Sequence, residues 1–133
     1  MFSARIWVDG ACRGNPGPAS IGGLIASPEG EVLKEISERL GTATNNIAEY
    51  TALIRALEEA KALGIRRVEA HSDSQLLVRQ MSGHYRVKHP GLQPLFVKAL
   101  ALSKGFEHFS FTHVPREENR EADRLANEAL DRR

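Results

Sequence analysis

The chain has 133 residues, of which 41% are hydrophobic and 26% charged, and its 18 basic and 17 acidic side chains give a net charge of +1. This composition is typical of a soluble globular protein, and the length favours one domain spanning residues 1–133. The single cysteine excludes an intrachain disulfide, and no apolar run approaches the ~18 residues of a membrane-spanning helix. Because no signal-peptide pattern precedes the first strand pattern, we expect a cytoplasmic monomer with no membrane partner.

The first part of the chain reads as three strands. Residues 10–18 are rich in glycine and proline, which predicts a loop, and Pro28-Glu29-Gly30 predicts a tight turn. The run at 31–40 also fits a helix, but its place directly after so short a turn favours the second arm of a hairpin. The three expected strands are residues 4–9, 19–27 and 31–40.

Helical spacing of apolar residues begins at Asn46. The elements expected from there on are a helix at 46–63, a strand at 67–72, helices at 74–81 and 92–102, a strand at 107–113, a loop at 115–119 and a last helix ending near residue 130. The order βββαβααβα indicates an α/β fold, with a mixed sheet and helices on its faces.

Basic residues are concentrated in one segment of the chain, without acidic residues among them. Residues 74–106 hold five lysines and arginines and no acidic residue, which leaves 13 bases against 17 acids elsewhere. They are Arg79, Arg86, Lys88, Lys98 and Lys104. Such a segment can form a surface that holds phosphates or an ordinary solvated face, and the sequence leaves both open.

Four acidic residues stand where carboxylates are out of place. Asp9 and Asp73 are each expected to end an apolar strand. Glu49 falls within the apolar face of the helix from Asn46, and Asp123 borders the apolar face of the last helix. Taken singly, Glu49 can be an edge residue favoured by the helix dipole, Asp73 a helix N-cap and Asp123 a surface residue. Together they indicate one buried site, because a core-facing carboxylate is costly unless it is paired or bound to a cation.

The predicted site offers only oxygen ligands. Oxygen ligands suit Mg²⁺ or Mn²⁺, whereas zinc sites use cysteine and histidine spacings that this chain lacks. Carboxylates from several elements can hold two such ions about 4 Å apart, an arrangement used to cleave phosphodiesters. The chain has no P-loop and no nucleophile elbow, which argues against nucleotide hydrolysis by that route and against a serine nucleophile.

Four motifs resemble those of type 1 ribonuclease H, in the same order along the chain. They are Asp9-Gly10-Ala11-Cys12-Arg13-Gly14-Asn15-Pro16-Gly17-Pro18, Thr44-Asn45-Asn46-Ile47-Ala48-Glu49, Asp73-Ser74-Gln75 and Asn119-Arg120-Glu121-Ala122-Asp123. The resemblance runs from about residue 4 to residue 130. It implies a ribonuclease H-like fold, in which a five-stranded sheet of three antiparallel and then parallel strands is flanked by helices.

The resemblance implies metal-dependent endonucleolytic cleavage of the RNA strand of RNA–DNA hybrids, leaving 3′-hydroxyl and 5′-phosphate ends. By it, the metal ligands are Asp9, Glu49, Asp73 and Asp123, and we expect two Mg²⁺ or Mn²⁺ ions when substrate is bound. The positions matching hybrid-contacting residues of the family are Gly10, Cys12, Asn15, Thr44, Asn45, Asn46 and Gln75. Without the resemblance, Asn45 and Asn46 could merely cap the helix, and the glycines and prolines merely turn the chain.

Two features vary within the family. His113 lies ten residues before the last aspartate, which is the spacing of a mobile-loop histidine in bacterial members. Arg116 lies seven residues before it, which is the spacing of an arginine in archaeal-type members. We favour Arg116 as the auxiliary catalytic residue, because His113 can belong to the preceding strand. The basic, tryptophan-containing protrusion of many members is shortened here to 82–90, so we expect a compact form with weaker hybrid binding and greater salt sensitivity.

Two other functions remain as alternatives to the hybrid-specific enzyme. A broader nuclease that also cuts double-stranded RNA is compatible with the missing protrusion and with Arg116. A catalytically silent nucleic-acid-binding module is the alternative of another class, and the presence of all four carboxylates argues against it.

Overall fold

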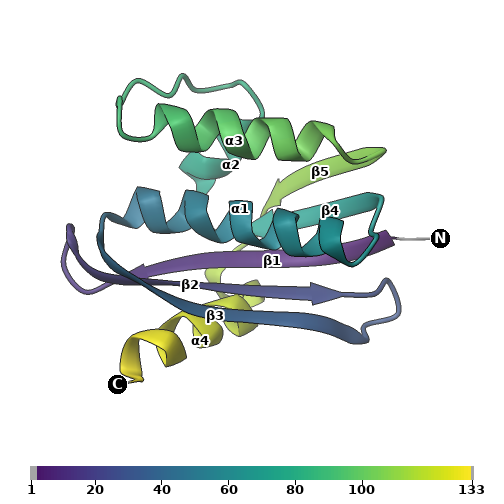
Figure 1. Cartoon of the computed structure of the whole chain (residues 1–133), viewed down its shortest axis with the longest axis horizontal. Coiled ribbons are helices and arrows are strands. Elements are labelled where there is room, and N and C mark those ends of the chain that lie inside the picture. Colours follow the sequence, from purple (N-terminus) through teal and green to yellow (C-terminus); the bar gives the residue numbers. More distant parts are fainter. Residues whose placement is uncertain (1–2, 133) are drawn as a thin grey trace.

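The structure, a computed structural model, describes residues 3–132 (Figure 1). In chain order the elements are β1 (Ser3–Cys12), β2 (Gly17–Ala26), β3 (Val32–Ala43), α1 (Asn45–Ala62), β4 (Arg67–Ser72), α2 (Gln75–Met81), α3 (Gln93–Lys104), β5 (His108–His113), the short 3₁₀ helix η1 (Arg116–Glu118) and α4 (Arg120–Asp131). None of the helices within residues 3–132 combines the length and apolar character of a membrane-spanning segment.

The five strands form one mixed sheet in the order β3-β2-β1-β4-β5. The strands β1, β2 and β3 pair antiparallel, whereas β4 runs parallel to both of its neighbours, β1 and β5. This confirms the expected order of elements and the expected change from antiparallel to parallel pairing. The central strand β1 is therefore the one that links the two halves of the sheet.

Helices cover both faces of the sheet, with α1, α2 and α3 on one side and α4 on the other (Figure 1). Two glycines mark where helix backbone packs directly on strand backbone. A Cβ on Gly10 of β1 would lie 2.7 Å from the carbonyl carbon of Ala48 in α1. A Cβ on Gly22 of β2 would lie 2.1 Å from the carbonyl oxygen of Ala122 in α4. Both helices are thus held close to the part of the sheet that carries Asp9, which pairs with Gly22.

The long helix α1 contributes much of the core. Its start is capped by Thr44, whose hydroxyl accepts a hydrogen bond from the Ile47 N–H at 3.2 Å. Leu53 and Leu57 are fully buried against the sheet, as their helical spacing predicted. Leu63 was expected on the same face and is instead 46% exposed, because the helix ends at Ala62.

The expected end of the first strand at Asp9 was wrong. β1 continues to Cys12, and the loop expected at 10–18 shrinks to residues 13–16. The reason is that antiparallel pairing with β2 continues to the pair Cys12–Ala19, and these ladder contacts override the local turn preference of Gly10. The loop expected at 115–119 likewise contains the short helix η1.

Asp9 nevertheless lies beyond the parallel part of the sheet. Pairing between β1 and β4 stops at Trp7 and His71, two residues before Asp9 and Asp73 respectively. Both carboxylates therefore lie just past the carboxyl end of the parallel ladder, where ligand sites form in sheets with helical crossovers.

Candidate functional site

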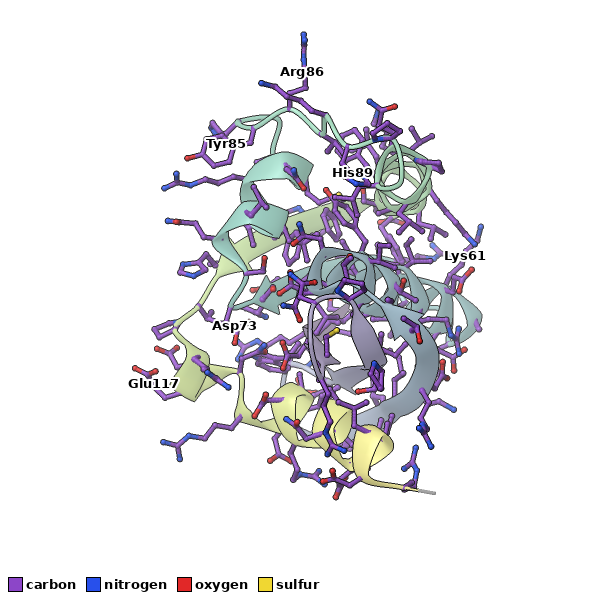
Figure 2. The ribbon with its side chains drawn as sticks, turned by 90° about the vertical axis from the view of Figure 1, so that its left-hand side faces the viewer. Lys61, Asp73, Tyr85, Arg86, His89 and Glu117 are labelled. Carbon is purple, nitrogen blue, oxygen red and sulfur yellow. The ribbon has the colours of Figure 1, made fainter. Side chains whose placement is uncertain are left out.

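Three carboxylates converge at this edge of the sheet. Asp9 comes from β1, Glu49 from α1 and Asp73 from the residue after β4. Each offers an oxygen, and these oxygens all lie within 4.8 Å of one another. Asp9 is only 8% exposed, whereas Asp73 is half-buried and lies between α2 and the segment that bears Glu117 (Figure 2). The arrangement is a small acidic cluster, buried at one end and open at the other.

The fourth predicted carboxylate approaches from α4, on the opposite face of the sheet from α1. Asp123 lies beside Asp9 and, after burial and the charge of Asp73, helps to raise the pKa of that carboxyl. Its own carboxylate accepts a hydrogen bond from the Asn127 amide at 3.1 Å. Asp123 lies outside the group of three whose oxygens are within 4.8 Å. The structure thus gathers all four acids, three of them tightly and the fourth beside Asp9.

The close approach of these acids changes their ionisation. Burial, followed by the negative charge of Asp73 and the hydrogen bond to Asp123, raises the pKa of Asp9 to about 8. Burial also raises the pKa of Glu49 to about 7, although a hydrogen bond from Ser74 opposes the change. Burial raises the pKa of Asp73 as well, against the positive charge of Arg116. The folded chain therefore concentrates negative charge that its own cations do not balance.

A cleft of about 500 Å³ opens over the carboxylates. The residues lining it are Asp9, Gly10, Ala11, Cys12, Arg13, Asn45, Asp73, Arg116, Asp123, Asn127 and Leu130. Three of the predicted substrate-contacting residues, Gly10, Cys12 and Asn45, are among them. A ligand in this cleft would contact the acids, the backbone at the end of β1 and the start of α1 together.

Three other predicted contact residues line a separate, smaller cavity of about 180 Å³. Asn15, Thr44 and Asn46 lie there with His89, which the sequence analysis did not single out. Asn15 also accepts a hydrogen bond from the Asn45 N–H at 3.0 Å, which ties the β1–β2 loop to the start of α1. Neighbouring residues at the start of α1 therefore line the two cavities, Asn45 the larger one and Asn46 the smaller one. Nothing in the spacing of His89 could have indicated this position, since the segment that carries it is irregular.

The remaining predicted contact, Gln75, behaves differently. It is the exposed first residue of α2 and does not line either of these two cavities. Its neighbour Ser74 is the cap of α2, its hydroxyl accepting from the Leu77 N–H at 3.2 Å. The explanation of Asp73 as a helix cap is therefore wrong. The same holds for Asn45 and Asn46, because Thr44 caps α1.

The structure separates the two candidates for the auxiliary role. His113 is the exposed last residue of β5, where it pairs with Ser72, and it does not line the cleft. Arg116, the first residue of η1, does line the cleft, and its charge opposes the rise in the pKa of Asp73 that burial causes. The arginine is therefore the cation that the fold brings to the carboxylates.

The basic segment at 74–106 does not act as one free surface. The guanidinium of Arg79 lies 5.3 Å from the centroid of the Tyr85 ring and donates to its hydroxyl at 2.6 Å. Lys98 pairs with Glu58 at 3.5 Å. Arg86 extends away from the body of the protein at the far end of the α2–α3 connection (Figure 2). Two of the five cations thus have partners in the chain itself.

The donor set fits a hard divalent cation. Asp9, Glu49 and Asp73 supply oxygen ligands from three different elements, and no histidine or cysteine belongs to the cluster among the described residues. Burial and then the negative charge of Asp73 raise the pKa of Asp9, and bound positive charge would oppose both effects. The residues present therefore suit Mg²⁺ or Mn²⁺.

Comparisons with known proteins agree with this arrangement. The family described as reverse transcriptase-like matches residues 7–129. A ribonuclease HI of Halobacterium salinarum is 48% identical over 125 residues, which are 94% of this chain and 63% of that protein. A bifunctional protein of Mycobacterium tuberculosis is 46% identical over 127 residues, 95% of this chain but 35% of the relative. The chain thus spans less than two thirds of the length of these relatives.

A solved structure resembles nearly the whole fold. It is a crystal structure of LC11-RNase H1 in complex with an RNA/DNA hybrid, with a TM-score of 0.91 and 46% sequence identity. The similarity covers 96% of this chain and 96% of that one. The shared region therefore includes every element that carries the acids.

Proposed function

The chain belongs to the ribonuclease H family, and from that premise we propose that it is a metal-dependent endoribonuclease that hydrolyses the RNA strand of RNA–DNA hybrids. The products would carry 3′-hydroxyl and 5′-phosphate ends. The observation that carries the proposal is the cluster of Asp9, Glu49 and Asp73, whose oxygens lie within 4.8 Å of one another. Two of these acids, Asp9 and Asp73, line an open cleft. Cytoplasmic action and a monomeric state stay predictions from the sequence.

The carboxylates account for the chemistry. Asp9, Glu49 and Asp73, with Asp123 beside them, would hold two Mg²⁺ or Mn²⁺ ions when substrate is bound. Divalent cations held in this way would supply activation of the attacking water and stabilisation of the leaving oxygen. Arg116, at the cleft wall, would contact the phosphate next to the cleaved bond.

Recognition of the hybrid would come from groups around the cleft. RNA is distinguished from DNA by the 2′-hydroxyl in a wide, shallow minor groove. The backbone at Gly10 and Cys12 and the side chain of Asn45 line the cleft, where they could bond this hydroxyl. Asn15, Thr44 and Asn46 would contact the hybrid from the smaller cavity. Gln75, which is exposed at the start of α2 two residues after Asp73, would also contact the substrate.

The test is cleavage of an end-labelled RNA–DNA hybrid with Mg²⁺ and separately with Mn²⁺. Single-stranded RNA, double-stranded RNA and duplex DNA of the same sequence serve as comparison substrates. We expect metal-dependent cleavage of the hybrid alone, with a rate that falls as salt is added, because salt weakens the contacts between basic side chains and phosphates. Cleavage of double-stranded RNA would move the assignment to a broader nuclease. Hybrid binding without cleavage under either metal would indicate a silent module.

A further inference from the structure

One buried side chain has an unusual hydrogen-bond pattern. Asn119, between η1 and α4, is only 1% exposed. Its side-chain oxygen is the one buried side-chain atom without a hydrogen-bond partner among the residues described. An unpaired buried acceptor reduces stability, so such a group in a native fold needs an explanation. The explanation here lies in what the amide donates to.

The amide nitrogen of Asn119 bonds to the strand that carries Asp9. It donates to the carbonyl oxygen of Val8 at 3.0 Å, in the buried interior. Pairing between β1 and β4 ends at Trp7 and His71. The bond from Asn119 therefore fixes β1 at Val8, one residue past the end of the parallel ladder. The residue fixed by it is the immediate neighbour of Asp9.

The same residue lies beside two other acids of the site. Near Asp73, its side chain opposes the rise in the pKa of that carboxyl that burial causes. Its backbone carbonyl accepts from the Asp123 N–H at 3.1 Å, in the first turn of α4. The amide nitrogen of Asn119 therefore binds the strand next to Asp9 and its backbone carbonyl binds Asp123, while its side-chain oxygen goes unpaired. The orientation of this side chain allows the bond to Val8 and leaves the side-chain oxygen without a partner.

We propose that Asn119 is a positioning residue that holds Asp9, Asp73 and Asp123 at the spacing that bound divalent cations need. The proposal rests on the function proposed above and assigns the residue a role toward the metal ions and not toward the hybrid. Removal of residues that orient metal ligands commonly weakens metal affinity roughly 10- to 100-fold. Loss of Asn119 should therefore weaken metal binding while leaving hybrid affinity unchanged.

Ser20 provides a matched control. Its buried hydroxyl also ties α4 to the sheet, by donating to the carbonyl oxygen of Ala126. It belongs to β2 and contacts none of the four acids in this bond. Ser20→Ala removes a buried contact of the same helix, and so measures what loosening α4 does by itself.

The experiment measures binding of Mn²⁺ alone by calorimetry, for the wild type, Asn119→Ala, Asn119→Ser and Ser20→Ala. We expect Asn119→Ala to weaken Mn²⁺ binding roughly 10-fold or more, Asn119→Ser to weaken it less because its hydroxyl retains a donor, and Ser20→Ala to leave it unchanged. Equal Mn²⁺ affinities for the wild type and Asn119→Ala would overturn the proposal, and so would an equal loss for Ser20→Ala. If Asn119→Ala does not fold, Asn119→Ser carries the same comparison.

Hybrid cleavage then separates this proposal from the proposed function. In Asn119→Ala the metal concentration for half-maximal cleavage should rise, and the KM for hybrid should stay at the wild-type value. A raised KM at saturating metal would contradict a positioning role toward the metal. An inactive wild type that still loses Mn²⁺ affinity on substitution of Asn119 would refute the ribonuclease function and leave the positioning role intact.

Discussion

Two groups of three carboxylates in this protein differ in their nearby cations. The first group consists of Glu38, Glu58 and Glu59 and surrounds Arg55, and the second consists of Asp9, Glu49 and Asp73. Arg55 lies 3.0 Å from Glu38, 3.3 Å from Glu58 and 3.7 Å from Glu59. The hydrogen bond from Arg55 lowers the pKa of Glu38 below its ordinary value. This group lies at the partly exposed contact of α1 with β3. Lys34, 3.4 Å from Glu59, and Lys98, 3.5 Å from Glu58, join Arg55 in balancing its three negative charges.

Within residues 3–132, the second group has no such cation at its centre. The oxygens of Asp9, Glu49 and Asp73 are within 4.8 Å of one another, and Arg116 reaches only the open side. Here the pKa of Asp9 rises to about 8. The difference shows how an acidic cluster that stabilises the fold can be told from one that binds a cation from solution. The first carries its own positive charge, and the second is arranged around a place for one.

Removing one charge from each group should give the largest contrast. Asp73→Asn should reduce hybrid cleavage more than about 100-fold, a barrier increase above ~2.7 kcal/mol, because a neutral amide cannot replace a carboxylate toward a divalent cation. Glu58→Gln, in the paired group, should leave the rate within about twofold. Single-turnover rates for both variants check this. An Asp73→Asn enzyme with more than about a tenth of the wild-type rate would show that the acids do not hold the metal.

Arg116, whose charge acts on Asp73 in the unbalanced group, should have a smaller effect. Arg116→Ala should lower the cleavage rate about 10-fold, since the residue lines the cleft and would stabilise charge on the phosphate. His113→Ala should change the rate less than about twofold, because the exposed histidine lies outside the cleft. Comparing the two variants under identical conditions decides between them, and the reverse order of effects would assign the auxiliary role to His113.

The two groups should also respond to pH with opposite sign. Burial raises the pKa of Asp9 from 3.8 to about 8 and the pKa of Glu49 from 4.5 to about 7. At a pH between the ordinary and the raised pKa, each carboxyl keeps its proton in the folded state and has lost it in the unfolded chain. In metal-free buffer the contribution of Asp9 and Glu49 to the free energy of unfolding should therefore be largest at low pH and should fall as the pH rises toward 8. Asp9→Asn should flatten this fall and be more stable than the wild type at pH 8 by about 1 kcal/mol or more. A wild type whose stability rises over the same range would contradict the raised pKa values.

The paired group gives the smallest effect. Since Arg55 lowers the pKa of Glu38, this carboxylate stabilises the fold above its ordinary pKa of 4.5 and ceases to do so as the pH falls through the lowered value. Glu38→Gln should destabilise the protein by about 0.5 kcal/mol at neutral pH, because the pair is partly exposed. Denaturant unfolding at pH 7 and in acid measures the difference, which should vanish in acid.

Much of the fold could be predicted from the sequence because local patterns agree with the tertiary structure. The helical spacing of Leu53 and Leu57 predicted α1, and both side chains are buried there. The end of β1 could not be predicted, because Gly10 has turn-like local preferences and only pairing with β2 keeps it in the strand. Long-range pairing of this kind leaves no mark in a short stretch of sequence.

The site, like the fold, could be predicted where a local sequence pattern indicates it, but not where it depends on long-range contacts. Asp9, Glu49 and Asp73 were suspected because a carboxylate at a core-facing position needs a partner, and the structure brings them together. The position of His89 beside Asn15 could not be predicted, because an irregular connection carries it there. The role of Asn119 depends on an unpaired oxygen and on a bond to Val8, which are properties of packing and not of spacing.

The most direct test of the claim that the second group awaits a cation is thermal unfolding of the wild type and Asp9→Asn at pH 8, with and without Mg²⁺ at matched ionic strength. A ligand that binds only the folded state raises its stability. We predict that Mg²⁺ raises the Tm of the wild type and leaves that of Asp9→Asn unchanged. An equal shift for both proteins, or none for the wild type, would contradict the account.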